Sequence, residues 1–166
     1  MPRLLIVGGG CRGRRLAAGL TAEGHAVRIT TRTAAARSAI EASGAECWIG
    51  TPDRLATLRG ALDGVTIACW LLGAARGSRE QVQELHTSRL RFFLGQAIDT
   101  TVRGFVYEAP ASTVAPDVLP AGERIVHALC ERNAIPVAFV RADPCDLDAW
   151  LSDAQRALDS LLARSR

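Results

Sequence analysis

Short apolar runs alternate with amphipathic segments along the whole chain. The apolar runs have the length of strands and are bounded by glycine or polar residues, which predicts buried β-strands. The segments between them carry apolar residues at helical spacing. We therefore expect strands over residues 4–7, 26–31, 46–49, 65–72, 105–108 and 137–141. We expect helices over residues 14–23, 34–42, 52–62, 79–100, 121–133 and 147–163.

This regular alternation of strand and helix predicts an α/β fold. Strands that are apolar throughout are typical of a parallel sheet, because helices cover both of its faces. We expect a doubly wound parallel sheet of about six strands, with ligands bound beyond the carboxyl ends of the strands. A chain of 166 residues fits one domain with its own core, so we interpret residues 1–166 as a single domain.

A glycine-rich turn joins the first strand to the first helix. Gly8, Gly10 and Gly13 match the pattern G-x-G-x-x-G, with Cys11 and Arg12 between them. The first glycine permits a tight turn, the second lets the backbone approach a pyrophosphate, and the third lets helix and strand pack closely. The helix N-terminus adds free N–H groups and a partial positive charge. The motif predicts the dinucleotide site of a three-layer Rossmann fold; the alternative is a glycine turn without a ligand.

Two residues inside this turn have open interpretations. Arg12 is either a phosphate ligand or a solvated loop residue. Cys11 is either an oxidisable thiol at a helix N-terminus or a small residue that fits a tight loop.

The end of the second strand favours one dinucleotide over another. An NAD site usually has an acidic residue here, which binds the ribose 2′-hydroxyl. This strand instead ends in Thr31, Arg32 and Thr33. A guanidinium group binds phosphate through its planar fork, so Arg32 indicates NADP, with NAD less favoured. The alternative is that Arg32 is an ordinary surface residue at a strand end.

The amino-acid composition excludes several catalytic mechanisms and one class of partner. Lys and Arg sum to 20, and every one of them is arginine. The absence of lysine from the sequence excludes a Schiff base, a P-loop lysine and a Tyr/Lys reductase pair. The net charge of +3 is spread along the chain, unlike the basic stripe of a nucleic-acid binder, so we expect no nucleic-acid partner. The 48% hydrophobic content indicates a globular chain.

The cysteines and the apolar runs indicate where the protein is located and whether it binds a metal. The five cysteines are scattered, without a CxxC pair or zinc spacing, which predicts reduced thiols, no metal and a cytoplasmic protein. The N-terminus enters a strand without a signal-peptide pattern. The longest strongly apolar run, residues 65–75, is too short for the ~20 residues of a membrane span, so we expect no membrane partner.

Several blocks, in order, resemble the atypical short-chain dehydrogenase/reductases of the NmrA-like kind. The blocks lie at residues 24–32, 44–46, 62–65, 97–107 and 133–141. The resemblance implies a Rossmann fold that binds NADP(H) or NAD(H). It implies roles for four groups of residues: Gly8, Gly10 and Gly13 at the pyrophosphate, Arg32 at the adenosine phosphate, Leu71, Leu72 and Gly73 along the middle of the cofactor, and the loop from Ala109 near the nicotinamide.

The chain also departs from that family. Thr51 follows Gly50 where the family often has an aspartate that contacts adenine. The fifth strand runs into Ala109 rather than a serine pair, with Ser112 and Thr113 further on. Tyr107, the only tyrosine, lies inside that strand. The chain ends about 25 residues past the sixth strand, at residue 166, so we expect the family's C-terminal substrate-binding part to be missing.

Together these features predict an NADP(H)-binding protein without an assigned catalytic residue. One hypothesis is an oxidoreductase that transfers hydride to or from the nicotinamide of an unknown substrate. The alternative is a non-catalytic dinucleotide sensor or regulatory protein with a small-molecule or protein partner. A third hypothesis places FAD or a nucleotide-sugar in the same site. The broad apolar stripe over residues 147–163 led us to expect a homodimer.

Three further residues have structural interpretations. His86 is expected to be an exposed helix residue, with a catalytic role as the alternative. His127 lies among apolar positions and is expected to pack. Asp146 is expected to cap the last helix.

Overall fold

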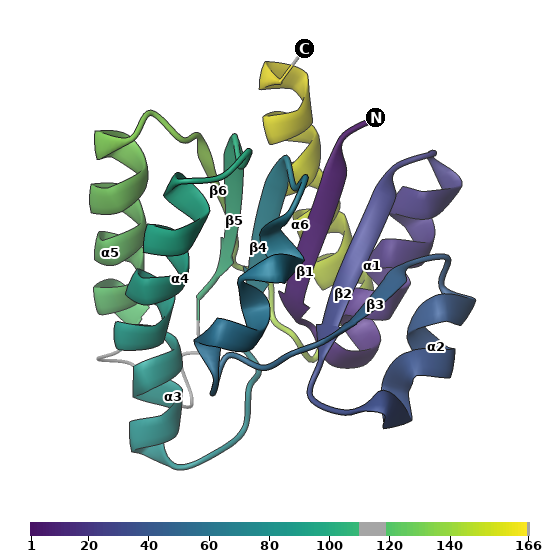
Figure 1. The fold of residues 1–166 in the computed structure, drawn as a ribbon, viewed down its shortest axis with the longest axis horizontal. Helices are drawn as coiled ribbons and strands as arrows, with labels where there is room; N and C mark the ends of the chain where they lie inside the picture. Colours follow the sequence, from purple (N-terminus) through teal and green to yellow (C-terminus); the bar gives the residue numbers. More distant parts are fainter. Residues whose placement is uncertain (110–118, 166) are drawn as a thin grey trace.

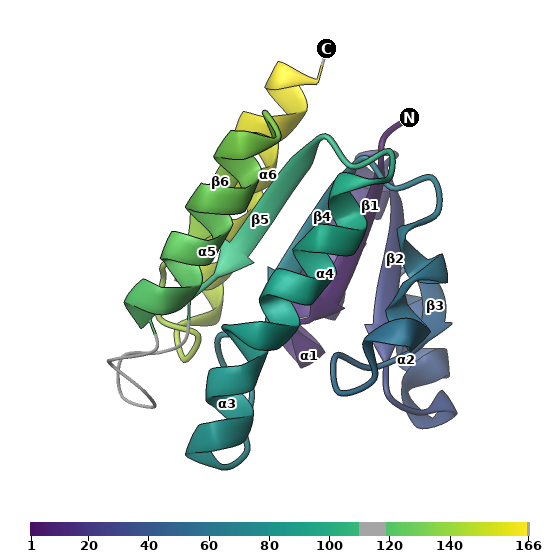
Figure 2. The ribbon, with the colours of Figure 1, turned by 60° about the vertical axis from the view of Figure 1, so that its left-hand side comes forward.

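Six parallel strands form one sheet in the computed structural model, which describes residues 1–109 and 119–165. The strands lie in the order β3-β2-β1-β4-β5-β6. This is the doubly wound arrangement, in which successive strands are added first on one side of β1 and then, from β4 on, on its other side. Their bounds are β1 (Arg3–Gly8), β2 (Ala26–Thr31), β3 (Glu46–Ile49), β4 (Ile67–Leu71), β5 (Gly104–Glu108) and β6 (Val137–Val140). Helices cover both faces, giving three layers (Figures 1 and 2). The expected α/β fold is confirmed.

The structure has α1 (Gly10–Ala22), α2 (Arg37–Ala42), α3 (Arg79–Leu85), α4 (Ser88–Ile98), α5 (Leu119–Arg132) and α6 (Leu147–Arg164). Four of the six expected helices are present as α1, α2, α5 and α6, with starts that differ from the expected ones by up to four residues. The other two expectations are wrong, as described below. Short 3₁₀ turns occur at η1 (Ala34–Ala36), η2 (Leu55–Leu58) and η3 (Gly60–Leu62).

The sheet divides the core into two layers because successive side chains of a strand point to opposite faces. In β1, Leu4 and Ile6 pack with buried residues of α1, α2 and α6. Leu5 and Val7 pack on the other face with η2, η3, α4 and α5. All four side chains are fully buried, so β1 lies at the centre of the molecule. The loop that follows β1 is therefore held by the most buried part of the fold.

The expected helix over residues 79–100 is wrong in one respect, because it is two helices. It breaks at His86 and Thr87, between α3 and α4. Thr87 has φ −131° and ψ −90°, which no helix accommodates. At the break, the His86 side chain turns into the core, where it is completely buried. The start of α3 is as expected: Ser78 and Gln81 form a reciprocal capping box.

The expected helix over residues 52–62 is also wrong. This segment contains the 3₁₀ turns η2 and η3 instead, and Thr51, just before it, pairs with Arg54 in an isolated antiparallel bridge. A Cβ atom at Gly60 would lie 2.8 Å from the Trp48 ring. The Trp48 indole N–H also donates to the Thr57 carbonyl at 2.8 Å. These contacts with β3 hold the segment in short turns rather than in one helix.

The apolar side chains of the last helix pack against the sheet of the same chain. Asp146 caps α6 by accepting from the Ala149 N–H at 3.0 Å, as expected. Trp150, Ala154, Leu158 and Leu161 are almost fully buried against the sheet. The stripe therefore gives no support to the expected homodimer, which stays a prediction.

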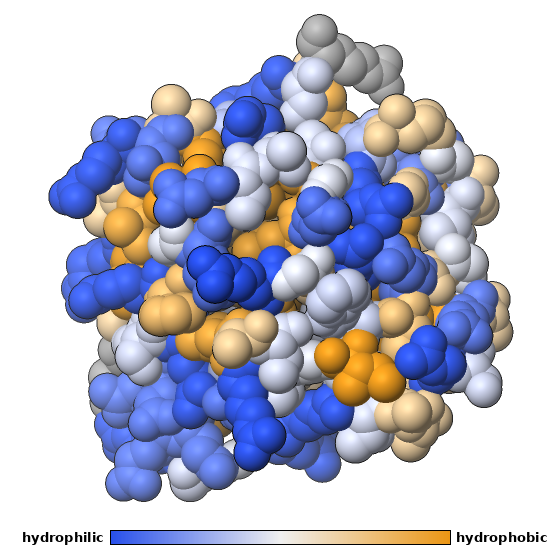
Figure 3. Space-filling view, viewed as in Figure 1, coloured by the Kyte–Doolittle hydropathy of each residue, from blue (hydrophilic) through white to orange (hydrophobic). Residues whose placement is uncertain are grey.

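The outer surface is largely polar on the face that Figure 3 shows, where apolar residues appear in patches between hydrophilic ones. None of the helices in residues 1–109 and 119–165 has the length and apolar character needed to cross a membrane.

Candidate functional site

Three consecutive glycines shape the loop between β1 and α1. Gly8, Gly9 and Gly10 have φ values of 86°, 83° and 51°, in the left-handed region that favours glycine. A Cβ atom on Gly8 would lie 2.6 Å from the Leu71 carbonyl oxygen. A Cβ atom on Gly13 would lie 3.0 Å from the Gly8 carbonyl oxygen. The glycines therefore allow both the turn and the close packing of β1, β4 and α1.

This loop opens directly into the N-terminus of α1, earlier than the expected start at residue 14. The Gly13 N–H donates to the Gly9 carbonyl at 2.9 Å, which closes the first helical turn. Gly9 is the N-cap and has no side chain to cap the helix. The N–H groups of the first turn therefore remain available for a ligand, and the helix dipole favours a negatively charged one.

A cavity of about 710 Å³ lies at this loop. Its walls come from the glycine loop, the end of β2, the segment after β4 and the segment after β6. The lining residues are Gly8, Gly9, Gly10, Cys11, Arg12, Arg32, Leu71, Leu72, Ala74, Ala75, Arg76, Pro144 and Cys145. The cavity thus lies beyond the carboxyl ends of the strands, on both sides of the point where the strand order reverses.

Four other predicted site residues lie beside the cavity rather than in its lining. Gly13 is buried beneath the glycine loop. Thr31 ends β2 and is partly buried. Gly73 is buried against the Glu108 side chain. Ala109 packs on the core layer that faces α4 and α5. Ser112 and Thr113, the hydroxyl residues that follow the fifth strand in the sequence, lie outside the described residues.

The segment after β6 contributes a wall that the sequence did not indicate. Pro144 and Cys145 line the cavity opposite the glycine loop. The Arg12 side chain joins the two walls, because its Nη1 donates to the Pro144 carbonyl at 3.4 Å. Its guanidinium carbon also lies 5.3 Å from the centre of the Trp150 ring in α6, within the range of a cation–π contact. Arg12 is therefore packed at the cavity wall and is not freely solvated.

Arg32 is paired in the structure. Its Nη2 lies 3.1 Å from Oδ2 of Asp53, and both side chains are about half exposed or more. The sequence pattern could not predict the contact of Asp53 with Arg32, because the whole of β3 lies between the two residues in the chain. Only the sheet order, which puts β3 beside β2, brings the two residues together.

A buried carboxyl group lies at the end of β5, next to the cavity wall. Glu108 is 2% exposed, and its Oε1 accepts from the Trp150 indole N–H at 3.1 Å. Its Oε2 has no hydrogen-bond partner among the described residues. Burial raises the pKa of Glu108 above its usual range, against the opposing effects of Trp150, the Arg12 charge and the Gly73 backbone. Sequence patterns could not indicate this buried carboxyl group, because a glutamate at a strand end is normally solvated.

A second buried polar pair lies on the other face of the sheet. Nδ1 of His86 is 2.7 Å from the Tyr107 hydroxyl, and Nε2 is 3.2 Å from the Leu72 carbonyl. Burial lowers the pKa of His86 to about 4, so the ring is neutral near pH 7. Its Nε2–H therefore donates to Leu72, and its Nδ1 accepts from Tyr107. The expectation of an exposed His86 is wrong.

This arrangement decides what Tyr107 can do. Burial, and after it the charges of Glu123 and Glu108, raise the pKa of Tyr107 well above its usual range. The side chain is completely buried and does not line the cavity. The hydroxyl is thus a structural group that joins β5 to the break between α3 and α4. His127, which we expected to be packed, is instead exposed, with its ring 4.9 Å from that of Phe139.

Two of the five cysteines belong to the cavity. Cys11 and Cys145 line it, and both are exposed. An Arg14 N–H donates to the Cys11 sulfur at 3.0 Å. Cys69 and Cys130 are buried in the core. The described residues contain no group of three or more His, Cys, Asp or Glu side chains that could hold a metal ion.

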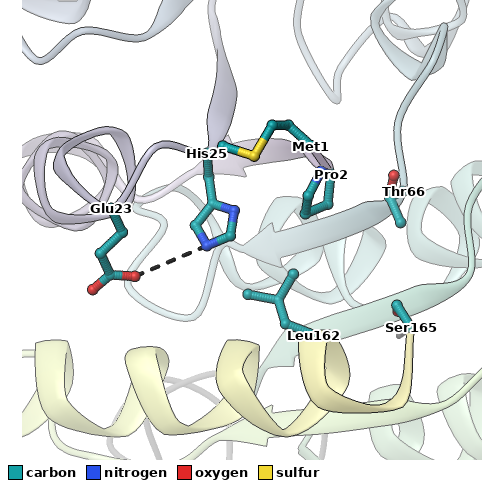
Figure 4. A pocket seen from close by; sticks show the side chains of 7 residues that line it. All are labelled: Met1, Pro2, Glu23, His25, Thr66, Leu162 and Ser165. Carbon is teal, nitrogen blue, oxygen red and sulfur yellow. Dashed lines mark ion pairs between the residues drawn. The ribbon is translucent and has the colours of Figure 1, made fainter.

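A second cavity of about 660 Å³ lies at the opposite end of the strands from the glycine loop. Met1, Pro2, Thr66, Leu162 and Ser165 line it together with His25 and Glu23, whose side chains lie 4.0 Å apart (Figure 4). It lies at the amino ends of the strands, whereas ligands of open α/β sheets bind at the carboxyl ends. The glycine-loop cavity is therefore the candidate site.

The strand order, the glycine loop and the position of the cavity define a doubly wound, Rossmann-type fold. No protein-family model matches the chain. No curated protein matches it.

Solved structures do share the fold. One is a short-chain dehydrogenase/reductase superfamily protein from Agrobacterium tumefaciens with bound NAD; it is 20% identical, the match covers 84% of this chain and 48% of that one, and the TM-score is 0.66. Another is the Citrobacter sp. triphenylmethane reductase complexed with NADP(H), at 17% identity, 84% and 48% coverage and a TM-score of 0.63. A third is UDP-glucuronic acid 4-epimerase from Bacillus cereus in complex with NAD, at 14% identity, 84% and 55% coverage and a TM-score of 0.67. The chain spans about half the length of these proteins.

Proposed function

We propose that this chain binds a nicotinamide dinucleotide and prefers NADP(H) to NAD(H). The observation that carries the proposal is the loop of three left-handed glycines, which opens onto a cavity that also contains Arg32. In such a loop, backbone N–H groups and a helix dipole are directed at phosphate. Solved structures of the same fold contain NAD or NADP(H), which supports the same ligand class here.

The residues present fit such a ligand. The glycine loop and Arg12 would hold the pyrophosphate, and Arg32 would bind the adenosine 2′-phosphate. The lining residues after β4, Leu71 and Leu72, would contact the middle of the dinucleotide. A side chain at Gly8 would collide with the Leu71 carbonyl oxygen. The loop therefore keeps backbone, not side chains, next to the phosphates.

The chemistry of the site is a separate proposal. A bound nicotinamide would supply or accept a hydride, while the protein would bind and orient it. An oxidoreductase of this kind would operate without the usual Tyr/Lys pair, because the chain has no lysine and Tyr107 is buried against His86. The same two observations favour the second candidate function, a dinucleotide sensor without catalysis.

Binding can be tested by titration with NADPH and NADH, followed by thermal shift and calorimetry. Bound ligand at 100 times its Kd stabilises a fold by about 2.7 kcal/mol, so a clear rise in Tm is expected with NADPH and a smaller rise with NADH. Equal or absent stabilisation by both would refute the NADP(H) preference. FAD and a nucleotide-sugar serve as further ligands, and a yellow purified protein would favour a flavin.

Catalysis can be tested by following NADPH absorbance with a panel of small carbonyl compounds. Turnover that is lost in Gly8→Val, a variant with an obstructed glycine loop, supports the oxidoreductase. Tight NADPH binding without turnover of any compound supports the sensor.

A further inference from the structure

We propose that Asp53 sets the NADP(H)/NAD(H) selectivity of this chain through its ion pair with Arg32. The proposal rests on the dinucleotide site described above and adds a residue to it. Arg32 is the lining arginine at the end of β2, and Asp53 is its carboxylate partner at 3.1 Å. The phosphate-binding group and an acidic group therefore lie side by side at the place where the two dinucleotides differ.

The position of Asp53 is fixed by its backbone. Arg89 of α4 donates to the Asp53 carbonyl at 2.8 Å and to the Pro52 carbonyl at 3.1 Å. The Asp53 N–H donates to Oγ1 of Thr51 at 3.2 Å, and the same hydroxyl lies 3.4 Å from Oδ2. These contacts keep the Asp53 backbone beside Arg32, and the Thr51 hydroxyl is the second partner of the carboxylate.

The two dinucleotides would use this pair differently. The ribose 2′-hydroxyl of NAD(H) donates to a carboxylate, so Asp53 would act as the acidic residue that β2 itself lacks. The 2′-phosphate of NADP(H) must take Arg32 from Asp53 and then lie beside an unpaired carboxylate. Exposed ion pairs contribute only up to about fivefold to an equilibrium constant, so the phosphate can displace Asp53. The carboxylate therefore reduces the preference for NADP(H) without abolishing it.

The experiment compares Kd values for NADPH and NADH by calorimetry in the wild-type protein, Asp53→Asn, Arg32→Gln and the double variant. In Asp53→Asn we expect NADPH to bind about fivefold more tightly and NADH to bind no better or more weakly. Arg32→Gln is expected to remove most of the NADPH preference. The gain from Asp53→Asn should be smaller when Arg32 is absent, because the competition for Arg32 is then lost and only the repulsion between the carboxylate and the phosphate remains.

Two controls separate this effect from a general change of charge. Glu41→Gln removes the same charge from the exposed pair Arg37–Glu41 on α2, where neither residue lines the cavity, and it should leave the ratio unchanged. Asp53→Ser removes the carboxylate with a different side chain and should repeat the result of Asp53→Asn, with Tm measured for both.

The results distinguish this inference from the proposed function. Wild-type protein that binds neither dinucleotide would overturn both. If the wild-type protein binds a dinucleotide and both Asp53→Asn and Asp53→Ser keep the wild-type ratio of the NADPH and NADH Kd values, only the role of Asp53 is overturned. A change of the same size in Glu41→Gln, or in the Arg32→Gln background, would also overturn it.

Discussion

The buried imidazole of His86 makes the stability of this protein depend on pH in a calculable way. Because burial lowers the pKa of His86 to about 4, the unfolded chain takes up a proton near pH 6.5 while the folded protein does not. A group with a lowered folded-state pKa contributes stability that is fully present above the unfolded-state value. That stability is lost as the pH falls towards the folded-state value. The relevant window is therefore pH 6.5 to 4.

The size of the loss follows from the two pKa values. The full difference of about 2.5 pH units corresponds to about 3 kcal/mol, of which about 2 kcal/mol falls between pH 7 and pH 5. With an m-value of about 2 kcal/mol/M, the urea midpoint should fall by about 1 M over this range through His86 alone.

The test is urea unfolding at pH 7, 6 and 5 in the wild-type protein and in His86→Gln. Glutamine does not titrate, and its amide can still accept from Tyr107 and donate to Leu72. We expect this variant to lose about 2 kcal/mol less than the wild type between pH 7 and pH 5. His127→Gln removes an exposed histidine and should follow the wild-type curve. An identical pH dependence in His86→Gln and wild type would refute the neutral, buried state of His86.

Three other predictions concern the core and the cavity. Glu108→Gln should gain stability relative to wild type as the pH rises from 4 to 8 in urea unfolding. Burial raises the pKa of Glu108, so the wild type loses stability as the unfolded chain ionises first; a constant difference would contradict this. Gly122→Ala should destabilise by more than about 1 kcal/mol because its Cβ would collide with the Tyr107 hydroxyl, whereas Gly95→Ala, in open space on α4, should stabilise by up to about 1 kcal/mol. N-ethylmaleimide should label Cys11 and Cys145 in mass spectrometry, and NADPH should protect both, since both line the cavity; unprotected labelling in saturating NADPH would place the dinucleotide elsewhere.

The sheet could be predicted closely because its signals are local. The strands at residues 26–31 and 46–49 coincide with β2 and β3, since each is an apolar run with clear boundaries. The glycine motif likewise identified the loop, because its backbone angles depend on glycine at fixed positions. These features need no knowledge of the rest of the chain.

Apart from the segment 52–62, the errors and omissions depend on contacts between residues that are distant in the sequence. The break at His86 occurs where a side chain finds Tyr107 and Leu72, which lie on two other strands or their ends. Helical periodicity continues through this break and therefore cannot reveal it. Glu108 finds Trp150 across 42 positions, and Asp53 meets Arg32 only through the strand order. The same dependence hid the cavity wall at Pro144.

The contact between Arg12 and Pro144 joins two segments that lie 132 positions apart in the chain. Residues that line the cavity come from the first helix of the chain and from the segment just before the last one. The cavity is therefore complete only when the segment after β6 has docked beside the glycine loop. A ligand that binds there selects fully folded molecules over partly folded ones, and its effect extends to the entire domain through mass action.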